Sequence, residues 1–173
     1  EDVLKRIPRR EIISYEKHMR KIFDNLNTDN KASMTIVGSY RRGAKDSGDI
    51  DVIITSTKKN TTIFNDFLDA MGEKILKEYL SRGNKKSLTI GKINKKPARR
   101  LDFMFTPLNE WPFAILYFTG SKLFNTLMRA RANDMNLTMN EHGLYHFKNK
   151  KKGDKIDVEF HSEKDIFDYL GIQ

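Results

Sequence analysis

The stretch GSYRRGAKDSGDIDV, from Gly38 to Val52, runs from a Gly-rich basic loop into an apolar segment and decides the fold. Before it, Ser33 to Val37 is a short apolar segment with β-branched residues, and Asp49 to Thr55 (DIDVIIT) is a second one. Both have the length and composition of strands. The sequence therefore predicts two strands joined by a loop rich in glycine and arginine.

Asp49 and Asp51 stand two apart at the start of the second strand. Because side chains alternate along a strand, both carboxylates face the same side, about 6.5 Å apart. Two carboxylates this close are unfavourable unless a cation neutralises them, and hard cations such as Mg²⁺ take oxygen ligands. A solvated strand start has the same pattern, so the pair by itself is a weak indication of a metal site.

The loop before this pair carries residue types that suit phosphate. Gly38 and Gly48 let the backbone approach a ligand closely, and Ser39 offers a hydroxyl donor. Arg41 and Arg42 bring guanidinium groups, which match phosphate oxygens. The loop therefore predicts a phosphate cradle beside a metal-binding pair. It has neither the Walker A pattern nor the GxGxxG fingerprint, which disfavours P-loop and Rossmann folds.

A third carboxylate, Asp102, lies in the otherwise apolar segment RRLDFMF at Arg99 to Phe105, which reads as a strand. An Asp between apolar neighbours is costly to bury without a partner. We expect Asp102 to complete a metal site with the first two carboxylates. The alternatives are that Asp102 faces solvent or pairs with Arg99 or Arg100. Arg99 itself is interpreted as a surface residue.

The rest of the chain alternates between helical and extended patterns. Apolar residues recur at helical spacing from Arg9 to Leu26. The other expected helices are Thr61–Met71, Pro112–Phe118, Ser121–Asn133 and a last one that opens at Ser162 with a capping-box pattern. The other expected strands are Leu76–Leu80 (which could equally continue a helix), Ser87–Ile93, and two or three between Leu137 and Phe160. A composition change near Pro107 to Gly120 predicts two domains, residues 1–107 and 108–173.

The composition favours an anionic partner and excludes several kinds of site. The 173 residues include 32 Lys and Arg against 23 Asp and Glu, a net charge of +9 that favours nucleic acid. The absence of Cys excludes disulfides and thiolate zinc sites, and the four His show no zinc-ligand grouping. No run approaches the roughly 18 apolar residues of a membrane span. We expect no membrane partner and an intracellular setting, with nothing to distinguish nucleus from cytoplasm.

Several segments in the same order resemble one family. Gly38 to Val52 resembles the signature of the nucleotidyltransferase superfamily, in a form similar to that of family X DNA polymerases, most closely the beta type. The other matching segments are KRIPR at Lys5–Arg9, RRLDF at Arg99–Phe103, LYFTGS at Leu116–Ser121, FN..MRA at Phe124–Ala130 and SEKDIFDYL at Ser162–Leu170. The resemblance implies an α+β fold. Residues 1–107 would be a palm, a mixed β-sheet with helices on one face, and residues 108–173 a small nucleotide-binding α/β subdomain, called thumb or fingers.

The resemblance also implies a role for each matching residue. The three carboxylates Asp49, Asp51 and Asp102 would bind two Mg²⁺ ions, for which Mn²⁺ can substitute, and Asp102 would assist loss of the primer 3′-hydroxyl proton. The implied nucleotide-binding residues are Arg6, Gly38, Ser39, Arg42 and Gly48 at the phosphates, Tyr117, Phe118 and Gly120 at the sugar, and Asn125 at the base. The implied DNA-binding residues are Lys86, Arg100 and Arg129. The family has a cis peptide bond at the position of Gly120-Ser121.

The implied activity is template-directed addition of dNTPs to the primer 3′-hydroxyl of a DNA primer-template, with release of pyrophosphate. We expect a monomer that fills gaps in DNA repair. The segment YFTG is similar to that of template-dependent members, whereas template-independent members have Gly-Trp there. Two alternatives stay open: a nucleotidyltransferase acting on RNA or another acceptor, and a DNA-binding fragment with little activity.

The chain also departs from the family pattern. Lys122 stands where the beta type has an acidic residue beside the incoming base, which leaves base preference open, and His142 replaces a Tyr. We expect this chain to lack the helix-hairpin-helix region that the family has ahead of the position of Glu1. We therefore expect the family's deoxyribose-phosphate lyase activity and its gap-binding contacts to be absent from this chain.

Overall fold

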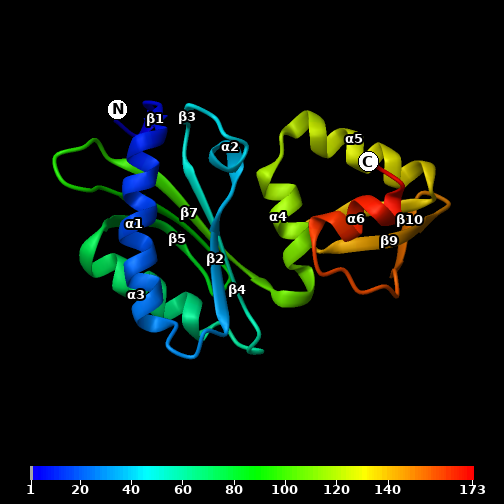
Figure 1. Cartoon of the computed structure of the whole chain (residues 1–173), viewed down its shortest axis with the longest axis horizontal. Helices are drawn as coiled ribbons and strands as arrows, with labels where there is room; N and C mark the ends of the chain where they lie inside the picture. Colours follow the sequence, from blue (N-terminus) through cyan, green and yellow to red (C-terminus); the bar gives the residue numbers. More distant parts are fainter. Residues whose placement is uncertain (1) are drawn as a thin grey trace. The chain divides into compact units, whose positions relative to one another are not determined.

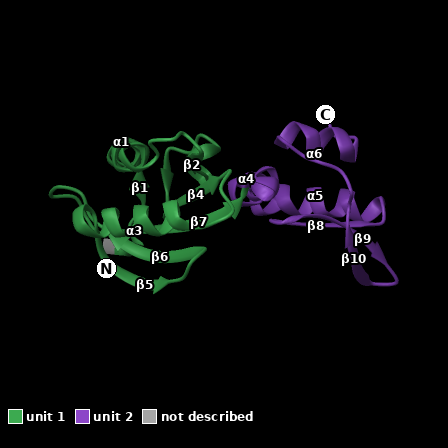
Figure 2. Cartoon of the chain, turned by 90° about the horizontal axis from the view of Figure 1, so that it is seen from below, with its two compact units in different colours: residues 1–107 green, residues 108–173 purple. Residues whose placement is uncertain are grey.

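Two units make up the chain in the computed structural model, Glu1–Pro107 and Leu108–Gln173 (Figure 2). The structure describes residues 2–173, so the expectation about the region before Glu1 lies outside the described residues. Both units contain helices and a β-sheet, in agreement with the predicted α+β class. Within residues 2–173, none of the helices combines the length and the apolar character needed to cross a membrane.

A five-stranded mixed sheet forms the centre of the first unit (Figure 1). Its strand order is β2-β4-β7-β6-β5, in which β4 and β7 are parallel and the other neighbours are antiparallel. The strands are β2 (Ala32–Ile36), β4 (Ile50–Ser56), β5 (Leu76–Arg82), β6 (Lys86–Gly91) and β7 (Arg99–Pro107). Each predicted strand of this unit is present, with ends that differ by at most two residues. The ambiguous segment that begins at Leu76 is a strand.

Two helices, α1 (Arg9–Leu26) and α3 (Thr62–Lys74), cover one face of this sheet (Figure 1). One stripe of α1 is buried against the sheet, as its spacing of apolar residues predicts: Ile12, Tyr15, Met19, Ile22 and Phe23. Phe67 of α3 makes edge-to-face contacts with Phe23 and with Phe103 of β7. The predicted arrangement, a mixed sheet with helices on one face, is therefore confirmed.

The two faces of the sheet differ in polarity: one packs against the helices, and the other carries the charged side chains of the predicted site. Leu101 and Phe103 of β7 belong to the core on the helix side. Because side chains alternate along a strand, Arg100 and Asp102 lie on the opposite face. Asp51 lies on that face too, since its two neighbours in β4 belong to the helix-side core. The acidic residues therefore share the face that the helices leave uncovered.

The segment between β2 and β4 contains more regular structure than the predicted loop. Gly38–Arg41 forms the short helix α2, and Asp46–Ser47 forms strand β3. Strand β3 pairs antiparallel with β1 (Ile7–Pro8), which follows the 3₁₀ turn Asp2–Leu4. The partner of β3 is distant in the sequence, so no local pattern indicated a strand there.

The second unit packs helices against a three-stranded antiparallel sheet. After the 3₁₀ turn Leu108–Glu110, its elements are α4 (Trp111–Thr119), α5 (Lys122–Asp134), β8 (Leu137–Asn140), β9 (Gly143–Lys148), β10 (Lys151–Lys155) and α6 (Glu163–Leu170). The sheet order is β10-β9-β8. Its core includes Phe113, Leu116, Met128, Ile166 and Leu170. Three strands are present where two or three were predicted.

The last helix begins with the cap that the sequence predicts. The Ser162 hydroxyl accepts a hydrogen bond from the backbone N–H of Asp165 at 3.2 Å. The Asp165 carboxylate accepts one from the backbone N–H of His161 at 2.8 Å, one residue earlier than in the usual capping box. Ser162 therefore ends the preceding loop and starts α6.

Candidate active site

Asp49, Asp51 and Asp102 lie together at the start of β4 and in the adjacent part of β7. Asp51 and Asp102 are direct register partners across the parallel pair of strands. One carboxylate oxygen from each of the three residues lies within 4.8 Å of the others. Oxygen ligands gathered in this way suit a hard divalent cation. The structure thus brings together the three carboxylates that the sequence singled out.

The electrostatics of these carboxylates also fit a cation. Partial burial raises the pKa of the Asp51 carboxyl to about 7, and the charges of Asp49 and Asp102 add to the effect. The pKa of Asp49 is raised as well, first by partial burial and then by the charge of Asp102. A guanidinium offsets part of this repulsion, because Arg100 Nη2 donates to Asp102 Oδ1 at 2.9 Å. A divalent ion would offset more of it.

Divalent cations are expected to raise the melting temperature more at about pH 8 than at about pH 5.5. The folded pKa of Asp51, about 7, lies above the ordinary value of 3.8. With chelator present, the folded chain therefore keeps a proton that the unfolded chain releases, and it loses stability as pH rises from about 4 through 7. A bound cation takes the place of that proton, so cation binding strengthens over the same range. Thermal unfolding with Mg²⁺ and with chelator measures this.

The Asp51→Asn variant is the control for this pH dependence. Asn has a similar shape but does not titrate, so the difference between the two pH values is expected to shrink in this variant. An equal Mg²⁺-induced rise in melting temperature at both pH values in the unmodified chain would show that the carboxylates do not bind the ion.

Gly38 packs directly against the carboxylate of Asp51. Its φ of +67° lies in the left-handed region that favours glycine, and a Cβ added there would lie 3.0 Å from Asp51 Oδ2. The backbone N–H of Val37 donates to the Asp51 carbonyl at 2.8 Å. The segment that carries the predicted phosphate-binding residues therefore starts in contact with the carboxylates.

The predicted phosphate-binding residues lie on the α2–β3 segment. Ser39 is in α2, and its Oγ is 2.6 Å from the Oγ of Ser47, a buried residue that the sequence did not single out. Arg42 follows α2 and is exposed. Gly48 follows β3, directly before Asp49. Nothing in the sequence distinguishes Ser47 from an exposed loop serine, because its burial depends on the pairing of β3 with β1.

Arg6 reaches the same segment from the residue before β1. Its Nε and Nη2 both donate to Asp46 Oδ1, at 2.9 and 2.7 Å. A Cβ added at Gly48 would lie 3.3 Å from Arg6 Nη1. The structure therefore places Arg6 beside Gly48, although more than half of its side chain is exposed.

Arg100 and Lys86 share the sheet face that carries Asp102. Arg100 precedes Asp102 by two residues in β7 and donates a hydrogen bond to its carboxylate. In the register of β6 with β7, Lys86 stands opposite Met104, the next position of this face after Asp102. Two of the three cationic residues predicted to bind DNA are thus on the face of the carboxylates.

Arg99 is buried, so the surface interpretation is wrong. Its Nε and Nη2 donate to the two carboxylate oxygens of Glu11, at 3.0 and 2.7 Å, and the two side chains are 4% and 6% exposed. Its Nη1 donates to the carbonyls of Lys5 and Arg6, each at 3.2 Å. Alternation along β7 turns Arg99 toward the helices, where α1 supplies the partner.

The remaining predicted site residues lie in the second unit. Tyr117 and Phe118 stand at the end of α4 with their ring centroids 5.0 Å apart in an edge-to-face arrangement. The peptide bond after Gly120 is cis, as the resemblance implied. Asn125 Nδ2 donates to the Tyr117 carbonyl at 2.7 Å, which ties α5 to the end of α4. Arg129 lies one turn further along α5 and is exposed.

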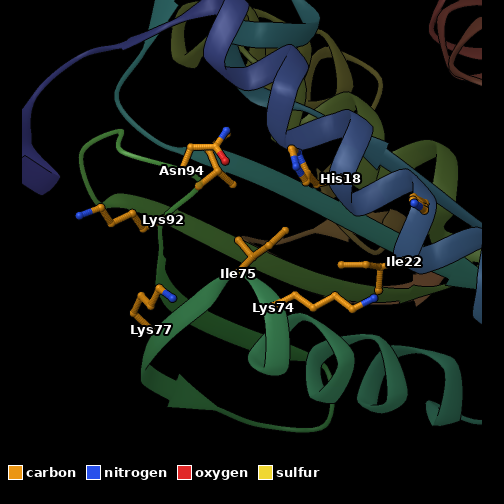
Figure 3. A pocket seen from close by; sticks show the side chains of 9 residues that line it. His18, Ile22, Lys74, Ile75, Lys77, Lys92 and Asn94 are labelled. Atoms are coloured by element: carbon orange, nitrogen blue, oxygen red, sulfur yellow. The ribbon is translucent and has the colours of Figure 1, made fainter.

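A cavity of about 580 Å³ opens on the helix side of the first unit (Figure 3). Its lining residues come from α1, from the junction of α3 with β5, and from the segment after β6: His18, Lys21, Ile22, Lys74, Ile75, Lys77, Lys92, Ile93 and Asn94. None of them is a predicted metal, nucleotide or DNA residue. The chemistry that the sequence predicts therefore lies outside this cavity, on the opposite face of the sheet.

Similarity to known proteins follows the same two units. Residues 6–108 match the DNA polymerase beta palm, and residues 114–173 match the DNA polymerase beta thumb. The palm match contains all three carboxylates and the α2–β3 segment. The thumb match contains the end of α4 and all of α5.

Three related proteins align with almost the whole chain. It is 30% identical to a DNA polymerase lambda of Rattus norvegicus, over 99% of this chain and 32% of the rat protein. It is also 26% identical to a DNA polymerase lambda of Arabidopsis thaliana, over 36% of that protein's length. It is 26% identical as well to a DNA nucleotidylexotransferase of Xenopus laevis, over 40% of that protein's length. The chain thus spans between about a third and two fifths of the length of these relatives. Because both palm and thumb match and together cover nearly all of its residues, the chain belongs to the family X DNA polymerases, the family of DNA polymerase beta.

Proposed function

We propose that this chain is the part of a DNA polymerase that transfers deoxynucleotides to a primer 3′-hydroxyl under the direction of a template. The observation that carries the proposal is the group of Asp49, Asp51 and Asp102, whose ligand oxygens lie within 4.8 Å of one another. The contact of Gly38 with Asp51 sets the predicted phosphate-binding segment against this group. Two of the relatives are named DNA polymerase lambda, which supports DNA as the acceptor.

The three carboxylates would hold two Mg²⁺ ions, or Mn²⁺ in their place. When bound, the ions would favour ionisation of the primer hydroxyl and offset the charge on the departing pyrophosphate. The raised pKa of Asp51 supports this assignment, because it marks a carboxylate that is partly buried and also close to the like charges of Asp49 and Asp102. Asp102, held by Arg100, would assist loss of the hydroxyl proton.

The residues around the α2–β3 segment would bind the triphosphate. The Ser39 hydroxyl and the backbone N–H of Gly48 offer neutral donors, and Arg6 and Arg42 offer guanidinium donors. Donors that are fixed before the reaction stabilise developing charge without reorganisation. On the DNA side, Arg100 would contact the primer-terminal phosphate.

The second unit would recognise sugar and base. Tyr117, Phe118 and Gly120 would form the wall beside the sugar, and Asn125 would reach the base. The hydrogen bond from Asn125 to the Tyr117 carbonyl supports a role for both residues in nucleotide binding, because it connects the residue proposed to reach the base with the turn proposed to contact the sugar. Arg129 would contact the template strand, and Lys86 of the first unit would contact a DNA phosphate.

Tyr117→Ala is expected to weaken the preference for dNTPs over rNTPs by roughly 10-fold or more, since it removes much of the wall that would exclude a ribose 2′-hydroxyl. Steady-state incorporation of dCTP and CTP opposite a template guanine measures the ratio of kcat/KM values. Leu123→Ala, which shortens an exposed side chain of α5, is the control. An unchanged ratio in Tyr117→Ala would remove this residue from the sugar site.

Primer extension tests the proposed function directly. The substrates are a recessed DNA primer-template, a one-nucleotide gap, a nick, an unpaired primer and an RNA primer, each with Mg²⁺ and with chelator. Templated, Mg²⁺-dependent extension is expected, and faster extension on the gap than on the recessed primer-template would support gap filling in repair. Extension of the unpaired primer alone would indicate untemplated transfer, and extension only of an RNA primer would indicate another acceptor. Salt-dependent DNA binding without any extension would indicate a binding fragment.

A further inference from the structure

We propose that Asp46 is an internal competitor for the phosphate groups of the nucleotide, because its carboxylate already occupies the guanidinium of Arg6. The inference rests on the proposed function, since it concerns the same nucleotide site. It goes further by assigning a role to a residue that opposes binding there.

The contacts between Arg6 and Asp46 are those that a phosphate oxygen would make. Arg6 Nε and Nη2 converge on a single oxygen, Asp46 Oδ1, and Nη2 also lies 3.3 Å from the Asp46 carbonyl. The two side chains are 62% and 50% exposed. An ion pair so open to solvent is weak and exchanges readily. A triphosphate, with more charge, can therefore displace the carboxylate from the guanidinium.

The backbones of both residues in this ion pair are fixed by contacts with neighbouring elements. The Arg6 carbonyl accepts a hydrogen bond from the buried Arg99, which is fixed in turn by Glu11. Asp46 belongs to β3, where it stands opposite Pro8 of β1. The backbones of Arg6 and Asp46 are thus fixed close together, so the ion pair forms again whenever a ligand leaves.

Asp46 also lies among the residues proposed to bind phosphate. It directly precedes Ser47, whose hydroxyl is bonded to that of Ser39, and Arg6 contacts the position of Gly48 on the other side. Its negative charge repels a phosphate group in the same place that Arg6 attracts one. Removal of the charge is therefore expected to tighten phosphate binding in two ways, since it replaces the ion pair with Arg6 by a weaker hydrogen bond and removes the repulsion.

The test is phosphate binding by the full chain with Asp46→Asn. Isothermal titration with dATP and with inorganic tripolyphosphate, each with Mg²⁺ and without DNA, measures the Kd. Asp46→Asn is expected to bind both ligands about two- to fivefold more tightly. The gain is expected to diminish at about 0.5 M salt, where exposed charges are screened. A gain in affinity cannot result from misfolding.

Two further variants make the interpretation specific. Asp24→Asn removes one exposed negative charge from α1, far along the helix from Arg6, and is expected to leave the Kd unchanged. In an Arg6→Ala background, Asp46→Asn is expected to give a smaller gain, because no ion pair with Arg6 remains to be weakened. If Asp46→Asn weakens binding, Asp46 orients Arg6 for the ligand and the proposal is overturned. An equal Kd, or no binding by either protein, also overturns it.

The outcome is separable from that of the proposed function. Tighter phosphate binding by Asp46→Asn in a chain that extends no primer supports the competitor role and contradicts the polymerase activity. Primer extension by the unmodified chain, together with an unchanged Kd in Asp46→Asn, supports the polymerase activity and contradicts the competitor role of Asp46.

Discussion

Replacing Asp102 with Ala is expected to slow nucleotide incorporation by roughly 10³-fold or more, which corresponds to a loss of about 4 kcal/mol of transition-state stabilisation. The replacement removes one of the three oxygen ligands that lie within 4.8 Å of one another. It also removes the group proposed to assist loss of the primer hydroxyl proton. Single-turnover primer extension with saturating Mg²⁺ and dNTP measures the rate.

The same variant is expected to stay folded, because it relieves repulsion among the carboxylates. Asp102→Asn is the matched variant: its amide oxygen can still accept the hydrogen bond from Arg100, while its charge is lost. Asp24→Ala on α1 is the control for loss of an acidic side chain elsewhere. Incorporation near the unmodified rate by either Asp102 variant would refute the assignment of this carboxylate to the chemistry.

Replacing Glu11 with Ala is expected to destabilise the chain by about 3 to 5 kcal/mol, because it leaves the guanidinium of Arg99 buried without its carboxylate. The two side chains are 6% and 4% exposed and share two hydrogen bonds, at 2.7 and 3.0 Å. Urea unfolding followed by circular dichroism measures the free energy of unfolding.

A surface ion pair provides the comparison for this variant. Lys58 Nζ lies 2.6 Å from Asp29 Oδ2, but the two side chains are 50% and 41% exposed. Asp29→Ala is therefore expected to change the unfolding midpoint little, since solvent screens the pair. The double variant Glu11→Leu with Arg99→Met is expected to recover much of the lost stability, because an apolar pair needs no partner. Equal effects of Glu11→Ala and Asp29→Ala would show that the buried pair contributes nothing special.

Local patterns predicted the elements of this fold well. Helix α1 runs from Arg9 to Leu26 as predicted, because helical spacing of apolar residues is a property of the segment itself. Strands β2, β4 and β7 were also predicted within one or two residues. Their apolar, β-branched composition and their turn-forming flanks are local signals as well.

Pairings between distant segments were not predictable. Strand β3 and the burial of Ser47 depend on β1, which lies about forty residues earlier. The same holds for Arg99, whose partner Glu11 lies on the first helix. An Arg in an RR pair resembles a surface residue until the strand's inward face is known.

The carboxylate site shows how the two kinds of information combine. The sequence by itself predicted that the carboxylates of Asp51, in β4, and of Asp49, directly before β4, point to the same side, because alternation of side chains is a local property of extended backbone. Only the tertiary structure decided that Asp102 stands beside Asp51, since the parallel register of β4 and β7 depends on how α3, β5 and β6 fold between them. Gly38, the first residue of the proposed phosphate-binding segment, depends on both kinds of information. The sequence shows that a glycine stands there, but its contact with Asp51 exists only because the sheet brings β2 and β4 together.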